Sequence, residues 1–207
     1  MKLGVITDGI SRNLEYALSV MRQSGLEYAE LQYIHDKEVG DLNDRELADV
    51  QQLVKAHEVE VSCISRHIFG GLSVNAVDRS SPIYQTHIEA LKRCIQMAKA
   101  LECPIVRTMS FRKEMILFGS HGADVWNVSS GTWNKFVSLM EGAVEVAEKE
   151  DITLVVETGN NALITSAWLG RKLSFHFGQK GLSFGILLII NVLTVSLRGE
   201  MFIFSLK

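Results

Sequence analysis

The sequence has few of the residues that mark unusual classes of chain. Its 207 residues include only two prolines and three cysteines, and its formal net charge is −3 at pH 7. So little proline, with 16 glycines, excludes a collagen-like or low-complexity polymer. The slight acidic surplus offers no basic surface to nucleic-acid phosphates. With 47% hydrophobic and 22% charged residues, the composition is that of a globular protein of one domain or a small pair.

The cysteines form no pattern that indicates a disulfide framework or a zinc site. Cys63, Cys94 and Cys103 are odd in number, include no CxxC pair and lack a histidine cluster at zinc-ligand spacing. We therefore expect reduced thiols in or near the core of a cytoplasmic protein. The first ten residues, MKLGVITDGI, lack the long apolar stretch of a secretion signal because Asp8 interrupts them, and they predict a first strand.

Residues 1–173 alternate short apolar segments with amphipathic ones. Apolar segments predict five strands, at residues 3–7, 28–34, 59–65, 104–110 and 152–158. Helical periodicity, capping residues or an initial proline predict helices from Leu14 to Gly25, after Asn43, from Pro82, around residues 136–146 and from Thr165. Five βα units of this kind indicate an α/β protein with a parallel sheet covered by helices.

Two architectures fit five βα units: an open, doubly wound sheet and a (β/α)8 barrel. Neither GxGxxG nor GxxxxGK[ST] follows any predicted strand, so the open nucleotide-binding sheet lacks its best signature. Polar residues gather after the strands, where barrel loops build active sites, and this favours the barrel. Eight units of this size need about 280 residues, so we expect an incomplete barrel of the TIM type.

The last segment of the chain, residues 174–207, differs from the rest. It holds four charged residues, and Gly181 to Leu197 has none. That run is shorter than a membrane helix of about 20 residues and is diluted by Asn191 and several Ser/Thr, so we expect no membrane span. Residues 186–195 have high β-propensity, which predicts either a makeshift strand at the sheet edge or aggregation.

Three segments carry a resemblance to a known family: CISRHIFGG (63–71), VRTMSFRKEMILFGSHGADVWN (106–127) and VVETGNNALITSAWLGRKL (155–173). They resemble the sugar phosphate isomerase/epimerase family, the xylose isomerase-like TIM barrels, over about residues 1–173. The family continues into a sixth strand ending in a pattern like Trp-Asp-Pro. One coding string for Phe184–Val192, shifted by one frame, encodes Trp-Asp-Pro. We therefore hypothesise a barrel part at 1–173 and a frameshift product at 174–207.

The resemblance implies a metal-dependent isomerase or epimerase acting on a sugar, a sugar phosphate or a related hydroxy-carbonyl compound. Such enzymes hold one divalent ion, commonly Mn²⁺, Mg²⁺, Co²⁺ or Zn²⁺, which polarises the carbonyl while a carboxylate moves the proton. Glu157 matches the first metal ligand and would be catalytic; the other three ligands have no match in this chain. The alternative is a structural glutamate satisfied by amides or by an arginine.

Further residues after the strands are candidates for substrate binding. The resemblance places His67 in the substrate pocket, with Arg66 beside it; a strand-end polar network is the alternative. Asn160 and Asn161 could bond sugar hydroxyls or only shape the turn. Arg112 could clamp a phosphate or carboxylate, or be a solvated charge.

Other functions stay open at this point. The chain could be a non-catalytic fragment or a small-molecule binding module. A remote alternative is a DNA-repair enzyme like endonuclease IV, which needs three zinc ions and many histidines. We expect a small-molecule partner, no nucleic acid and no membrane. Because a barrel that lacks strands exposes its sheet edges, we also expect homo-oligomers or poor solubility.

Overall fold

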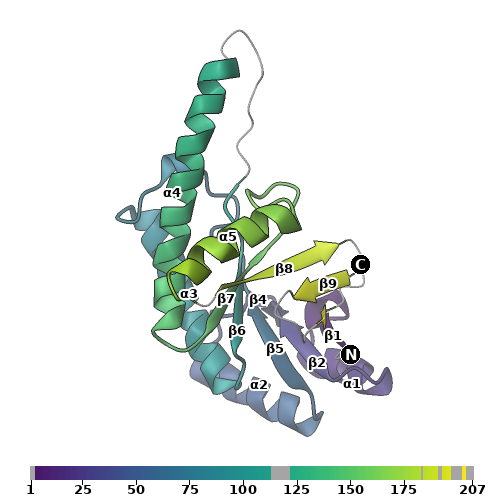
Figure 1. Cartoon of the computed structure of the whole chain (residues 1–207). Helices are drawn as coiled ribbons and strands as arrows, with labels where there is room; N and C mark the ends of the chain where they lie inside the picture. The colour runs from purple at the N-terminus through teal and green to yellow at the C-terminus, as the bar shows by residue number, and fades with distance from the viewer. Residues whose placement is uncertain (1–2, 113–121, 183, 191–192, 197–201, 204–207) are drawn as a thin grey trace.

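A computed structural model describes residues 3–112, 122–182, 184–190, 193–196 and 202–203, with side chains at 3–112, 131–182 and 184–185. The chain forms an α/β barrel (Figure 1). Its barrel strands are β1 (Leu3–Ile6), β2 (Tyr28–Leu31), β5 (Glu60–Ser65), β6 (Ile105–Thr108), β7 (Thr153–Glu157), β8 (Phe184–Ile190), β9 (Leu193–Ser196) and β10 (Phe202–Ile203). The α-helices are α1 (Leu14–Gln23), α2 (Asp44–Ala56), α3 (Pro82–Ala100), α4 (Gly122–Glu148) and α5 (Ala167–Gln179).

The sheet closes on itself in the order β1-β2-β5-β6-β7-β8-β9-β10 and back to β1. Every neighbouring pair from β1 to β8 is parallel, as the βα pattern predicts. β9 runs antiparallel to both β8 and β10, and β10 pairs parallel with β1. The barrel prediction is therefore confirmed over the open sheet. As a (β/α)8 fold the barrel is incomplete, because only β1, β2 and β5 to β8 form the continuous parallel run, and the apolar tail forms the strands that its β-propensity predicts and closes the sheet with them.

The predicted helix starts carry the expected local signals. Asn43 and Glu46 form a complete capping box at the start of α2, and Asn13 caps α1 by accepting a hydrogen bond from the backbone of Tyr16. Pro82 occupies the first turn of α3, where its missing N–H costs nothing. Ser166 caps α5 through its side chain. These short-range signals position the helices that cover the sheet.

Two features differ from the sequence-based expectation. α4 begins at Gly122, well before the apolar stripe that starts at Phe136, and its first turns project beyond the barrel in Figure 1. Its first half, residues 122–135, is rich in glycine, serine, threonine and asparagine, which in sequence are typical of a loop. The segment after β2 forms a small separate hairpin, β3 (Tyr33–Ile34) with β4 (Lys37–Glu38), where a longer strand was expected.

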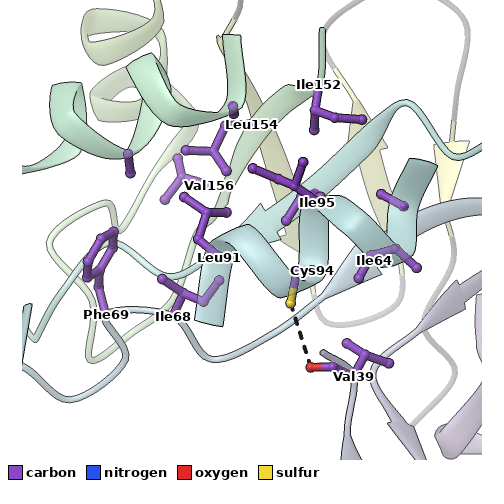
Figure 2. Packing of buried hydrophobic residues seen from close by; sticks show 14 of the residues in the cluster. Val39, Ile64, Ile68, Phe69, Leu91, Cys94, Ile95, Ile152, Leu154 and Val156 are labelled. Carbon is purple, nitrogen blue, oxygen red and sulfur yellow. Dashed lines mark hydrogen bonds between the residues drawn. The ribbon is translucent and has the colours of Figure 1, made fainter. Parts of the chain in front are cut away.

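The core lies between the helices and the outer face of the sheet. Figure 2 shows Leu91 and Ile95 of α3 packed near Leu154 and Val156 of β7, and all four are buried. The dashed line in Figure 2 joins Sγ of Cys94 to the carbonyl oxygen of Val39, 3.6 Å apart. Such interdigitated packing fixes the strands on which the polar loops stand.

All three cysteines are free and buried, as predicted. Burial raises the pKa of Cys94 and of Cys103 to about 12, and it raises that of Cys63 well above its ordinary value.

The proposed division at residue 173 falls inside α5, which continues without a break to Gln179. The division and its frameshift origin stay predictions. In the part of the chain that the structure describes, none of the helices combines the length and apolar character needed to cross a bilayer.

Candidate functional site

A cavity of about 680 Å³ opens beyond the carboxyl ends of β5, β6 and β7. Its walls come from the loops that follow these three strands, and they contain His67, Gly70, Gly71, Met109, Phe111, Arg112, Gly159, Asn160, Asn161 and Ala162. In barrels of parallel strands, this end of the sheet carries the active site. The cavity therefore lies at the end of the barrel where active sites are found in this kind of fold.

Four of the residues predicted for substrate binding meet in this cavity: His67, Arg112, Asn160 and Asn161. They come from three separate loops, so the fold brings together what the sequence keeps up to 94 positions apart. Arg66 and Glu157 do not line its walls.

His67 is held in place by hydrogen bonds to the hairpin after β2. Its Nδ1 lies 2.7 Å from Oε1 of Glu38, and the same oxygen accepts the His67 backbone N–H at 2.9 Å. The side-chain nitrogen of Gln32 lies 3.2 Å from Nε2 of His67. This arrangement places the proton on Nδ1 and leaves Nε2 as the acceptor. The strand-end polar network is therefore present, and the ring still borders the cavity.

Glu38 carries the charge in this network. Partial burial raises the pKa of its carboxyl, but the two hydrogen bonds from His67 and the charge of Arg66 outweigh that effect and lower it. Glu38 is therefore an anion at neutral pH and fixes the orientation of the imidazole.

Arg66 turns toward the same hairpin. Its guanidinium donates to the carbonyl of Val39 at 2.6 Å and to Oδ2 of Asp41 at 2.8 Å, and it pairs with Glu38 at 3.4 Å. Through these contacts Arg66 links the loop after β5 to the hairpin, next to the cavity. Its direct role in substrate binding stays a prediction.

The loop after β5 rests on an aromatic stack. Phe69 has a positive φ of 64°, and its ring stacks on Phe111 with centroids 4.6 Å apart and on Tyr84 at 5.4 Å. Its backbone N–H donates to Nδ1 of His87 on α3 at 3.1 Å. Burial lowers the pKa of His87 and so keeps this acceptor neutral. The stack pins an unfavourable backbone conformation next to the cavity wall.

The loop after β7 is fastened to the loop after β6. The hydroxyl of Ser110 accepts the backbone N–H of Ile164 at 2.9 Å, and Arg112 forms an antiparallel bridge with Ala162. A turn closed by the Ala162 N–H on the Gly159 carbonyl, at 3.1 Å, leaves Asn160 and Asn161 exposed at its tip. The two asparagines thus form the tip of a turn, and both line the cavity.

Glu157 ends β7 and forms an ion pair with Arg107 of β6. Arg107 also pairs with Glu30 of β2, with 3.3 Å between Nε and Oε1, and Glu30 accepts a hydrogen bond from the hydroxyl of Ser65. The side chains of Arg107, Glu30 and Glu157 are 2%, 0% and 15% exposed. Burial raises the pKa of Glu30, against the opposing effects of Arg107 and Ser65.

The arginine-paired alternative for Glu157 is the arrangement that the structure shows. Sequence reasoning did not single out Glu30 or Arg107. The available signal was a charge inside each of two apolar strands, YAEL and IVRT. A buried charge within a strand indicates a partner across the sheet.

The side chains do not fit the divalent ion that the resemblance implies. Within the described residues, His, Cys, Asp and Glu nowhere gather in a group of three that could hold a metal. Glu157 directs its carboxylate at a guanidinium instead. A hard cation needs several oxygen ligands, and the contacts of Glu157 supply a competing positive charge.

A family model described as "Xylose isomerase-like TIM barrel" matches residues 18–183. Comparison with curated protein sequences finds no match. Among solved structures, D-psicose 3-epimerase with D-tagatose from Clostridium cellulolyticum H10 is similar, with a TM-score of 0.62, 14% identity, and coverage of 91% of this chain and 63% of that one. The probable 3-DHS dehydratase AsbF of Bacillus anthracis is similar with a TM-score of 0.65 and 16% identity. The similarity covers 91% of this chain and 62% of that one.

A xylose isomerase-like TIM barrel protein from Mycobacterium smegmatis, in complex with magnesium, is also similar. Its TM-score is 0.54 at 13% identity, with coverage of 83% of this chain and 54% of that one. At such identities the structural likeness shows the fold. This chain spans little more than 60% of the length of the first two structures.

Proposed function

Because this chain belongs to the xylose isomerase-like TIM barrel family, we propose that it binds a small sugar or related hydroxy-carbonyl compound in the cavity beyond β5, β6 and β7. The chemistry we propose for it is that of a sugar isomerase or epimerase, with slow or absent turnover in this chain. Its partner is a small molecule, and a cytoplasmic location and self-association are part of the same proposal.

The observation that carries the proposal is the convergence of polar side chains in the cavity. Asn160 and Asn161 offer amide donors and acceptors for hydroxyl groups, and the fixed imidazole ring of His67 forms part of the wall. Arg112 adds a positive charge suited to a phosphate or carboxylate group on the ligand. Met109 supplies apolar surface for the carbon skeleton. A concave site with a few convergent polar groups is the usual form of a small-molecule site.

Turnover needs a carboxylate that moves a proton next to the carbonyl, and Glu157 is the residue we propose for it. It stands two positions before Gly159 on the cavity wall, but the wall does not include it. The ion pair with Arg107 holds its carboxylate toward the barrel interior. Binding without turnover is therefore the second candidate function.

Ligand-observed NMR of the full chain with D-tagatose, D-allulose and L-ribulose tests the binding proposal. We expect Asn161→Ala to weaken the best ligand about tenfold, because it removes hydrogen bonds worth roughly 1 kcal/mol or more. Asn134→Ala, at an exposed position on α4 outside the cavity, is the matched control and should not change the affinity. Equal affinities of the two variants, or no binding by the wild type, would contradict the proposal.

Product formation separates the two candidate functions. The same ketoses are incubated with the wild type and with Glu157→Gln, and epimers or isomers are measured by chromatography. Turnover that Glu157→Gln abolishes supports the enzymatic role, whereas saturable binding without product supports the binding module.

A further inference from the structure

Arg107 is the largest of the fully buried side chains among the residues described. It stands on β6 between two acidic neighbours, Glu30 on β2 and Glu157 on β7. Removing a guanidinium from water is costly unless carboxylates compensate its charge. This chain provides two of them, so the position of Arg107 is determined by the acidic groups around it.

Hydrogen bonding leaves the cluster incompletely satisfied. Among the described residues, Nε and Nη2 of Arg107 and the Oε2 atoms of Glu30 and Glu157 have no hydrogen-bond partner, although the ion pairs are in place. The guanidinium is thus held mainly by its ion pairs with Glu30 and Glu157. Charge alone could also be provided by a different cation in the same place.

A divalent ion at Glu157 would meet the guanidinium of Arg107 at close range. Two positive groups a few ångströms apart repel strongly where water is excluded. Glu157 can therefore serve Arg107 or a metal ion, and the contact in this chain is with Arg107.

We propose that the buried guanidinium of Arg107 takes the place of a metal ion beside Glu157, so that Glu157 of this chain does not ligate a divalent cation. Removal of that guanidinium takes the compensating positive charge away from Glu30 and Glu157, and a hard cation that displaces their protons can then bind both carboxyl groups. Their affinity for a hard cation then rises, since ligand charge sets the strength of such sites.

Titration of the full-length chain with Mn²⁺, followed by the electron paramagnetic resonance signal of the free ion, tests this directly. We expect Glu157→Gln to bind Mn²⁺ with the same affinity as the wild type, whatever that affinity is. Arg107→Met should bind at least about tenfold more tightly than the wild type. Arg107→Lys, which keeps the positive charge, is the matched control and should behave as the wild type.

The proposal is overturned if Glu157→Gln weakens Mn²⁺ binding tenfold or more. It is also overturned if a folded Arg107→Met, checked by circular dichroism, gains no affinity. Should Arg107→Met not fold, the comparison of the wild type with Glu157→Gln still decides, because Glu157→Gln keeps the pair of Arg107 with Glu30. The titration contains no sugar, so its outcome is independent of ligand binding in the cavity.

Discussion

At the scale of single residues, Glu38 organises one side of the cavity. One carboxylate joins the ring and backbone of His67 and the guanidinium of Arg66. All three partners are donors, so the carboxylate is useful only while it is ionised. The orientation of His67 is therefore linked to pH through a residue that does not itself line the cavity.

The Glu38 network predicts a loss of stability in acid. The folded-state pKa of Glu38 lies below its unfolded value, so its contribution is complete above the unfolded pKa of roughly 4.3 and is lost as the pH falls through the lower folded value. We expect Glu38→Gln to lower the free energy of unfolding at pH 7 by about 1–3 kcal/mol. Between about pH 5 and 3, the free energy of unfolding of this variant should fall less steeply with decreasing pH than that of the wild type. Urea unfolding at several pH values measures both effects.

Glu58→Gln is the control, because its exposed pair with Arg22 is of the kind that contributes little. Equal pH profiles for Glu38→Gln and the wild type would show that the network does not stabilise the fold.

The sequence located the cavity residues but not the buried ion pairs. His67, Arg112, Asn160 and Asn161 follow predicted strands, and in a parallel barrel this position alone brings them to one end. Arg107 and Glu30 lie within strands, and the sequence does not say which face of a strand turns to the interior of the barrel. Their partnership depends on strand order and register, which only the folded sheet supplies.

At the scale of elements, the packing of α4 on α3 depends on a glycine. A Cβ atom at Gly142 would lie 2.6 Å from the hydroxyl oxygen of Tyr84, which is buried and donates to the carbonyl of Leu139 at 2.7 Å. Tyr84 in turn stacks on Phe69 beside the cavity. The close approach of two helices thus supports the aromatic stack under the loop after β5.

We predict that Gly142→Ala destabilises the protein by about 1–3 kcal/mol, because the buried Tyr84 hydroxyl must move. Gly131→Ala, on the same helix with open space around it, should stabilise by up to about 1 kcal/mol through helix propensity. Thermal unfolding of both variants gives the comparison. In a Tyr84→Phe background most of the cost of Gly142→Ala should disappear, and the remainder should come from Arg79, whose Nε would lie 3.2 Å from the added Cβ. An undiminished cost there would show that the Tyr84 hydroxyl is not the source of the strain.

Most elements were predictable because their signals are local. The capping box at Asn43 and the proline at the start of α3 mark their helices within a few residues. The β3–β4 hairpin escaped detection because strands of two residues have no alternation to detect. The early start of α4 escaped because the glycine, serine and asparagine residues of 122–135 are, in sequence, typical of a loop.

At the scale of the whole molecule, the barrel is closed by the apolar tail. β8 pairs with β7 over four residue pairs, from Leu154 with Phe184 to Glu157 with Leu187, and β10 pairs with β1. The expectation of poor solubility assumed unpaired edges on β1 and β7, and in this topology both edges have partners. The behaviour of the chain in solution stays a prediction.

A variant that ends at residue 182 should lose this closure. We expect it to form heterogeneous oligomers on size-exclusion chromatography and to bind a hydrophobic dye, because the edges of β1 and β7 become free to pair with other chains. The full chain under the same conditions is the control. A monodisperse shortened variant with unchanged unfolding would show that β8 to β10 contribute nothing to the fold.

The three buried thiols report on the order in which parts of the chain unfold. Only a thiolate reacts rapidly with an alkylating reagent, and burial keeps Cys63, Cys94 and Cys103 protonated and out of reach. Each is therefore labelled only when its surroundings separate: Cys94 with the outer helix layer, Cys63 with the wall of β5. Mass spectrometry of the alkylated protein over time gives the order in which the three thiols react. This order shows whether the helices detach before the barrel strands separate, and we expect Cys63 to react last.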